Sequence, residues 1–237
     1  MDTASSEQAF VLDDIAFQPQ ISVLAKRLRL KPDSGQISEL KPLLNEATSL
    51  ARPKAMYRLA FIDEKRADSV LIDGVELRSR VLRVNLEIAH RVFAYIATCG
   101  TELQAWGEGL DDMVHQYWAD AIKELALGAA IRALDEHLHA CYELGKTATM
   151  APGSLADWPI REQRPLFRVL GDPKAAIGVE LTDSFLMIPN KTVSGIRFPT
   201  EERFESCQLC PRDICPGRRA AYEPDLFERK YNKAQAD

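Results

Sequence analysis

The sequence predicts an α+β fold, because short strand-like runs lie on both sides of one long helical segment. Apolar and β-branched residues are dense between positions 55 and 79, around the dipeptide Asp73-Gly74. The segment from Asp112 to Tyr142 contains no proline and carries a helical apolar pattern. Three more short apolar runs follow after position 175. With 237 residues and 46% hydrophobic content, the chain can bury one large core or two smaller ones.

The first 52 residues are mostly polar with short apolar groupings. "ISVLAKRLRL" and "ISELKPLLNEATSLA" are typical of helical pieces, and Pro53 then interrupts the chain. We expect residues 1–52 to form a helical outer layer that packs on the main domain.

Two strands are expected next, in "AMYRLAFI" and "SVLIDGVELRS". Asp73-Gly74 favours a tight hairpin turn between strands. The following run, "RVFAYIATCG", ends at Gly100 and suits either a buried strand or the end of a helix, because periodicity alone does not separate the two.

The segment from Asp112 to Tyr142 is the clearest element, and it predicts one long central helix. Trp118, Ile122, Leu125 and Ala129 recur at helical spacing. A second stripe broadens the apolar face, so both sides of the helix should be covered; it comprises Leu127, Ile131, Leu134, Leu138 and Cys141. We expect the helix to form the spine of the core and to stop near Gly145.

The remainder before the C-terminus is expected to hold a loop and three short strands. "MAPGSLADWPIREQRPLF" carries three prolines and a glycine, which favours an ordered loop with at most a short helix. "AIGVEL", "SFLMI" and "TVSGIRF" are separated by turn-forming residues and are typical of strands.

Charge and motif content exclude several classes of function. The net charge is −5 and no basic run is present, which argues against a nucleic-acid partner. No apolar run approaches the roughly 20 residues that a bilayer requires, and the acidic start "MDTASSEQAF" is unlike a signal peptide, so we expect a cytoplasmic protein without a membrane partner. The motifs of serine hydrolases, P-loop enzymes and dinucleotide-binding folds are missing. His137 and His139, two residues apart on the helix, are expected to be surface side chains rather than a metal pair.

A cysteine cluster near the C-terminus is the strongest chemical signal. Cys207, Cys210 and Cys215 fall within "ESCQLCPRDICPGRRAAY", whereas the preceding two hundred residues hold two cysteines. Thiolates separated by two and by four intervening residues can converge on one cation, so the cluster predicts a metal site. The spacing suits an iron–sulfur cluster, zinc with a remote ligand, or free thiols and a disulfide. Cys99 is a candidate fourth ligand, and its alternative role is that of a small core residue.

One further stretch resembles a known family. The pattern L-T-[ED]-S-[FY]-x-M-x-P-x-x-[ST]-V-S-G is matched by Leu181, Thr182, Asp183, Ser184, Phe185, Met187, Pro189, Thr192, Val193, Ser194 and Gly195. Together with the earlier "APG", it resembles the reactivation domain of cobalamin-dependent methionine synthase, and more closely the stand-alone proteins that carry this domain with a cysteine-rich tail. The resemblance covers roughly residues 50 to 220. It implies a twisted antiparallel sheet flanked by helices, and it divides the chain into 1–52, an activation-like domain at 53–202 and a Cys-rich extension at 203–237.

The resemblance also implies a ligand and a partner. Domains of this family bind S-adenosylmethionine and dock on a corrinoid-carrying domain, so cobalamin is expected on the partner. The implied cofactor-binding residues are Ala151, Pro152, Gly153, Ser184, Thr192, Ser194 and Gly195. One departure weakens the expected affinity: the family's R-P-A-P-G-Y segment is replaced by "TMAPGS", so Thr149 and Ser154 stand where Arg and Tyr are expected.

These observations predict an accessory protein that docks on a corrinoid protein or cobalamin-dependent methyltransferase and supports reductive reactivation of its cobalt. An iron–sulfur cluster on the cysteines would supply the electron, since its potentials reach about −700 mV. The alternative is a non-redox subunit of a split methionine synthase, in which zinc stabilises the C-terminal loop, because zinc has no redox chemistry. An independent enzyme is not favoured, because no nucleophile or general-base constellation is recognisable.

Overall fold

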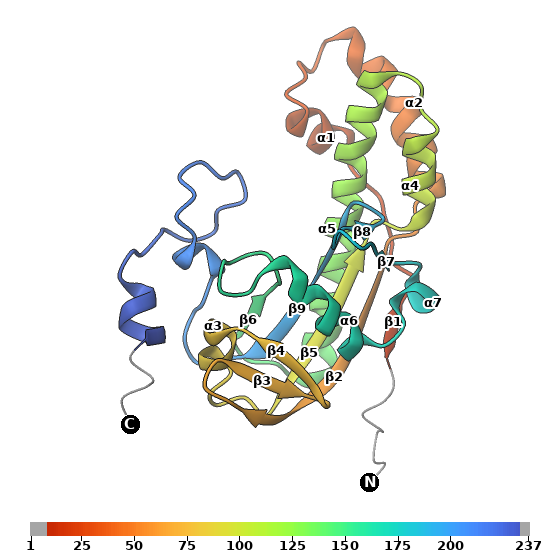
Figure 1. Ribbon diagram of the computed structural model, residues 1–237. Helices are drawn as coiled ribbons and strands as arrows, with labels where there is room; N and C mark the ends of the chain where they lie inside the picture. Colours follow the sequence, from red (N-terminus) through yellow and green to blue (C-terminus); the bar gives the residue numbers. More distant parts are fainter. Residues whose placement is uncertain (1–8, 233–237) are drawn as a thin grey trace.

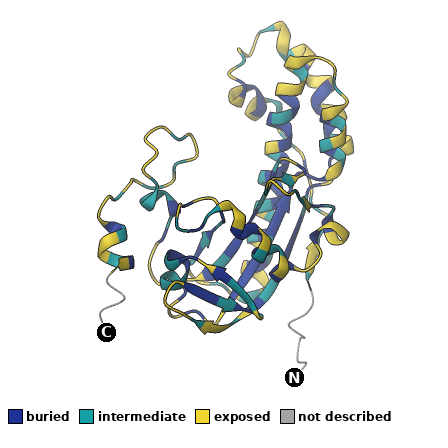
Figure 2. Ribbon diagram, viewed as in Figure 1, coloured by how far each residue is buried: buried dark blue, intermediate teal, exposed yellow. Residues whose placement is uncertain are grey.

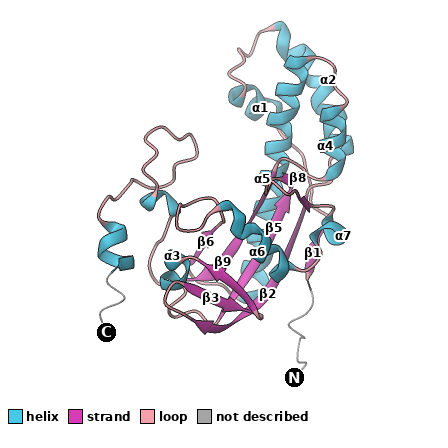
Figure 3. Cartoon of the chain, viewed as in Figure 1, coloured by secondary structure: helices cyan, strands magenta, loops and turns pink. Residues whose placement is uncertain are grey.

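The computed structural model describes residues 9–232 and shows an antiparallel sheet with helices on both faces and a helical lobe at one end (Figures 1 and 3). The sheet has seven strands in the order β4-β3-β2-β5-β9-β6, and β1 pairs with β2 beside this path. The α+β class, the antiparallel sheet and the long helix predicted from the sequence are therefore confirmed.

The sheet is built around β2 (Lys54–Lys65), which pairs with β1 (Phe10–Leu12), β3 (Ser69–Ile72) and β5 (Arg91–Thr98). Asp73 and Gly74 both have positive φ and form the tight turn from β3 to β4 (Val75–Arg78), as predicted. The region from 54 to 78 holds three strands rather than two, because β2 is a separate long strand ahead of the hairpin. The ambiguous run ending at Gly100 is the buried strand β5.

The long helix α5 (Met113–Tyr142) begins where the sequence predicts. The Asp112 side chain caps it by accepting hydrogen bonds from the backbone N–H groups of Val114 (2.7 Å) and His115 (2.9 Å). The helix ends at Tyr142, as the segment from Asp112 to Tyr142 predicts, and Glu143 caps it in the left-handed conformation (φ 47°) two residues before Gly145. The second half of α5 packs on β2 and β5 through Leu127, Ala130, Leu134 and Leu138.

The first half of α5 extends beyond the sheet and forms the helical lobe (Figure 1). It packs with α1 (Ile21–Arg27), α2 (Gly35–Leu50) and α4 (Thr101–Glu108). Figure 2 shows the buried faces of these helices turned toward one another. The helical pieces expected before Pro53 are thus present and share a core with the first half of α5, and β1 was not predicted.

The other face of the sheet is covered by α3 (Arg80–Asn85), α6 (Gln163–Leu170) and α7 (Pro173–Ile177). The predicted strand "AIGVEL" is therefore wrong in its first half. Asp172 caps α7 and Gly178 ends it with φ +74°, which leaves only β7 (Glu180–Leu181) to pair with β8 (Met187–Ile188). Strand β9 (Thr192–Pro199) is present as expected, and β6 (Thr147–Met150) joins it at the sheet edge.

The C-terminal segment returns to the main core. Phe204, Leu226 and Tyr231 are all buried in the cluster that also holds α6 and the sheet. Between them lie a short 3₁₀ turn, η2 (Ser206–Leu209), and an extended loop, and a π-helical turn, η3 (Phe227–Asn232), follows. Among the described residues, no helix is long and apolar enough to cross a membrane.

Candidate ligand-binding edge and cysteine loop

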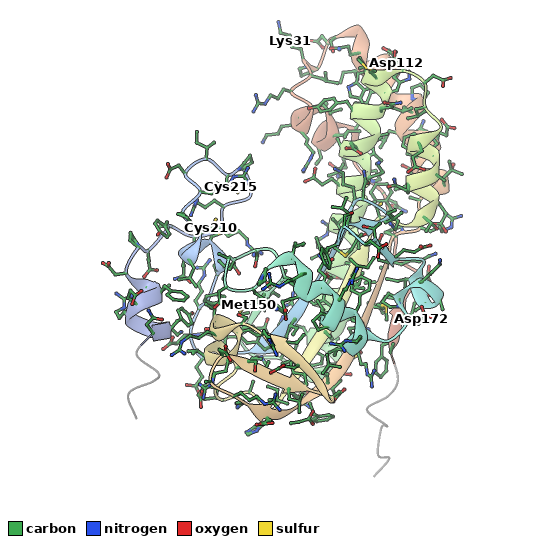
Figure 4. The ribbon with its side chains drawn as sticks, viewed as in Figure 1. Lys31, Asp112, Met150, Asp172, Cys210 and Cys215 are labelled. Atoms are coloured by element: carbon green, nitrogen blue, oxygen red, sulfur yellow. The ribbon has the colours of Figure 1, made fainter. Side chains whose placement is uncertain are left out.

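The sheet edge formed by β6 and β9 brings two of the predicted binding segments together. In the register, Met150 pairs with Ile196, so the turn Ala151-Pro152-Gly153 leaves the sheet beside Gly195. A Cβ on Gly195 would lie 2.6 Å from the Met150 carbonyl oxygen. Figure 4 labels Met150 at this edge. We call this region, from Thr149 to Gly153 together with Gly195 and Arg197, the β6–β9 edge.

Both glycines of the β6–β9 edge are explained by packing. Gly195 pairs with Tyr95 of β5, and a Cβ there would also approach the Tyr95 hydroxyl oxygen to 3.0 Å. Gly153 has φ +85°, its N–H donates to the Trp158 carbonyl (2.7 Å), and a Cβ would meet Ile160 at 2.7 Å. The packing of both glycines therefore shapes the edge.

Arg197 supplies a buried cation at this edge. Its side chain is 11% exposed, ion-pairs with Asp135 of α5, and donates to Thr147 Oγ1 at 3.3 Å. Its Nε has no partner among the residues that the structure describes. Because Arg197 pairs directly with Thr149 across the ladder, their side chains share the face toward α5. The guanidinium therefore stands next to the position at which the sequence lacks the expected Arg.

Two neighbours set the electrostatics around Arg197. Burial raises the pKa of Asp135, and the Arg197 guanidinium opposes that rise. Burial also raises the pKa of the Tyr95 hydroxyl, while the charges of Arg197 and of Arg219, from the cysteine-bearing loop, act in the opposite direction. The β6–β9 edge thus holds the Arg197 cation and the neutral Tyr95 phenol. It also holds the Asp135 carboxyl group, whose rise in pKa is partly opposed by Arg197.

The remaining predicted binding residues lie elsewhere. Ser194 alternates to the opposite face of β9, is 3% exposed, and its Oγ has no partner in the described part of the chain. Thr192 is buried and donates to Thr98 Oγ1 (2.8 Å), a structural contact between neighbouring strands. Ser184 is exposed in the β7–β8 turn, with its Oγ 3.0 Å from Thr182 Oγ1. The structure does not bring Ser184 to the β6–β9 edge.

Arg197, Asp135 and Tyr95 were missed by the sequence reasoning. The sequence carries no signal for a buried Arg197, since alternation in "TVSGIRF" places it on the face opposite Ile196 and Phe198, where a charged residue is expected to meet solvent. Asp135 and Tyr95 carried no signal either, because only the packing of α5 on the sheet shows that they approach Arg197.

The cysteines at 207, 210 and 215 share one loop, which is closed at its base. The Gln208 side chain donates to Glu223 (2.8 Å), and the Glu223 N–H donates to the Gln208 carbonyl (2.8 Å). Inside the loop, the Arg218 guanidinium binds the carbonyls of Cys207, Cys210 and Ala220 at 3.2 Å each, and also that of Arg212. The loop is therefore organised by one arginine. Figure 4 shows Cys210 and Cys215 on this loop as it extends away from the sheet.

The thiols differ in their surroundings. Cys207 Sγ accepts a hydrogen bond from the Arg219 backbone N–H (3.4 Å), and this contact lowers the pKa of the thiol. No group of three His, Cys, Asp or Glu side chains within residues 9–232 is arranged to hold an ion, so the three loop thiols do not converge here. Cys99 is fully buried in the core of the helical lobe, where burial raises the pKa of its thiol to about 11.

Comparison with known proteins adds one finding. No protein-family model and no curated protein matches the sequence. Among solved structures, the chain is similar to the crystal structure of the MetH reactivation domain bound to AdoHcy, with a TM-score of 0.57 and 15% sequence identity, over 84% of this chain and 80% of that chain. At this identity the likeness shows the fold. The fold is therefore that of a reactivation domain, as the motif resemblance implied.

Proposed function

We propose that the protein binds a ligand of the S-adenosylmethionine type at the β6–β9 edge and supports reactivation of the cobalt in a corrinoid protein or cobalamin-dependent methyltransferase. The observation that carries the proposal is the fold shared with a reactivation domain that binds AdoHcy, the demethylated form of S-adenosylmethionine. The motif "LTDSFLMIPNKTVSG" and the "APG" turn support it independently.

Within this proposal, Arg197 binds the carboxylate of the ligand's amino-acid end. A guanidinium with an unpartnered Nε at the ladder position opposite Thr149 can donate to an anion that approaches the β6–β9 edge. Thr149 itself offers one hydroxyl and no charge. The cation thus lies on β9 rather than at position 149 of β6. Arg197 supplies the positive charge that Thr149 lacks.

The cysteine loop is the redox part of the proposal. Its three thiols are the donor type that iron–sulfur clusters and zinc prefer, and the contact that lowers the pKa of Cys207 favours the ligating thiolate. To hold a cluster, the loop must close so that the thiols converge. When bound, an iron–sulfur cluster supplies a one-electron reductant. Zinc in the same loop supports the alternative, a non-redox regulatory subunit of a cobalamin-dependent methionine synthase.

The ligand site is tested by calorimetric titration with S-adenosylmethionine. We expect Arg197→Met to weaken binding about tenfold to a hundredfold, the effect of losing a hydrogen bond to a charged group. Arg66→Met, at an exposed arginine that pairs with Glu64 and Glu76 beside the β2–β3 turn, is the matched control and should leave the dissociation constant unchanged.

A double variant separates a ligand contact from a loss of folding. Thr149→Arg in the Arg197→Met background restores a guanidinium at the edge from the opposite strand, so we expect it to recover most of the affinity. Equal affinity in all four proteins, at unchanged melting temperature, would place the ligand elsewhere.

The cysteine loop is tested by anaerobic purification followed by iron, sulfide and zinc analysis. We expect iron and sulfide to be bound, and to be lost when any one of Cys207, Cys210 or Cys215 is changed to Ala. Cys141→Ala, at an exposed cysteine of α5, is the control that should keep the metal. Stoichiometric zinc without iron would replace the redox proposal by the regulatory one, and metal retained after two of the loop cysteines are lost would contradict both. Loss on changing Cys99 would identify a fourth ligand.

A further inference from the structure

A second group of reactive side chains lies at the C-terminal end of α5, and the proposed function does not use it. Cys141 is exposed, and its Sγ lies 3.6 Å from Nε2 and 3.9 Å from Nδ1 of His137, one helical turn earlier. The Tyr57 hydroxyl of β2 lies 3.1 Å from His137 Nε2 and 3.3 Å from the Tyr142 hydroxyl. The four side chains form a continuous polar cluster.

The buried side of this cluster is rigid. Tyr57 is 1% exposed, and its ring is stacked on Phe10 with centroids 5.0 Å apart. Burial raises the pKa of Tyr57 well above its ordinary value, with a further rise from its contact with Tyr142, so the phenol stays protonated. A neutral hydroxyl fixed in this way can accept from or donate to His137 Nε2, and it therefore orients the imidazole in both protonation states.

On the exposed side of the cluster, the Cys141 thiol lies next to His137, which can act as its base. His137 can take the proton of the Cys141 thiol, which leaves a thiolate beside an imidazolium whose N–H is held by Tyr57. A nucleophile, a base and a group that orients the base are the arrangement that activates cysteines. Cys99 is buried and therefore inaccessible, whereas Cys141 faces solvent.

We propose that Cys141 is a reactive thiol activated by His137, and that it forms a reversible mixed disulfide with low-molecular-weight disulfides. The Cys141 thiolate attacks one sulfur of the small disulfide. The new S–S bond forms as the old one breaks, and the leaving thiolate takes the proton that His137 received. Cys141 and one half of the small disulfide are joined at the oxidation level of a disulfide, and the other half leaves as a thiol, so no further oxidant is needed.

The test is alkylation by iodoacetamide at pH 7, resolved by mass spectrometry of the tryptic peptide "ALDEHLHACYELGK", in which Cys141 is the sole cysteine. An exposed ion pair contributes modestly, so we expect the Cys141 rate to fall about threefold to fivefold in His137→Asn. His139→Asn is the matched control: this histidine is exposed near the end of α5 and contacts the Leu144 carbonyl, so its loss should leave the rate unchanged.

A second variant and a second probe complete the experiment. Tyr57→Phe keeps the ring on Phe10 but removes the hydroxyl that orients His137, and it should give a smaller loss of rate. Incubation with glutathione disulfide should add one glutathione to the same peptide of the wild-type protein, reversibly with reductant and more slowly in His137→Asn. Equal rates in wild type and His137→Asn, or an equal loss in His139→Asn, would overturn the proposal.

Discussion

At the scale of single residues, Gly195 shows how a motif residue can be fixed by packing and still define a site. Its missing side chain leaves room for the Tyr95 hydroxyl and the Met150 carbonyl, which both approach the same point. This close approach lets β6 lie on β9 with the "APG" turn beside it. A motif match at Gly195 therefore reports the shape of the edge, whereas the positive charge at the edge is carried by Arg197.

Gly195→Ala should lower the free energy of unfolding by about 1–3 kcal/mol, the usual cost of forcing an extra carbon into a packed region, because the added Cβ meets backbone as well as the Tyr95 ring. Urea denaturation measures this change. Gly128→Ala in α5 is the matched control: its Cβ would meet nothing closer than an Arg132 side-chain nitrogen at 3.6 Å, so we expect a gain of up to about 1 kcal/mol from helix propensity. A destabilisation of similar size in both variants would contradict the packing argument.

At the scale of elements, side-chain caps mark helix boundaries that the apolar pattern alone left open. Asp112 marks the start of α5 in both the sequence and the structure. The same kind of signal was available for α7, since Asp172 is followed by Pro173 and later by Gly178, but the apolar letters of "AIGVEL" were interpreted as a strand. α5 ends at Tyr142, as predicted, but the residue that caps it is Glu143 rather than Gly145, and few non-glycine residues take its left-handed conformation.

Short edge strands were the elements that the sequence predicted least well. β1 and β6 have three and four residues, and each exists because a longer strand offers it a ladder partner. No pattern of that length distinguishes a strand from a loop. The same limit applies to the candidate site. The motif located the "APG" turn and Gly195, but the pairing of Thr149 with Arg197 cannot be predicted until β6 is known to be a strand.

At the scale of the whole molecule, α5 joins two cores and the C-terminal segment belongs to one of them. The first half of α5 completes the helical lobe, and its second half covers the sheet. The cysteine loop leaves the main core after Phe204 and returns to it at Leu226. The segment expected as an extension from residue 203 is thus integrated at both ends of the loop, which holds the base of the loop in a fixed position relative to the sheet.

Tyr231 is the main contact that fixes the returning end. It is fully buried, its hydroxyl donates to Asn85 Oδ1 of α3 at 3.1 Å, and burial raises its pKa to about 12. Arg80 at the start of α3 donates to the Tyr231 carbonyl. Removing the Tyr231 ring should therefore destabilise the main core itself, rather than only free the cysteine loop.

We expect Tyr231→Ala to lower the free energy of unfolding by about 3–5 kcal/mol, the usual range for a large buried aromatic side chain. Tyr231→Phe, which loses only the bond to Asn85, should cost about 1 kcal/mol. Tyr222→Ala is the control, because Tyr222 is 42% exposed on the same segment and its loss should change stability by less than about 0.5 kcal/mol. Chemical denaturation monitored by circular dichroism measures all three. If Tyr231→Ala were as mild as Tyr222→Ala, the C-terminal segment would be an appended tail, and the fixed position inferred for the base of the cysteine loop would be lost with it.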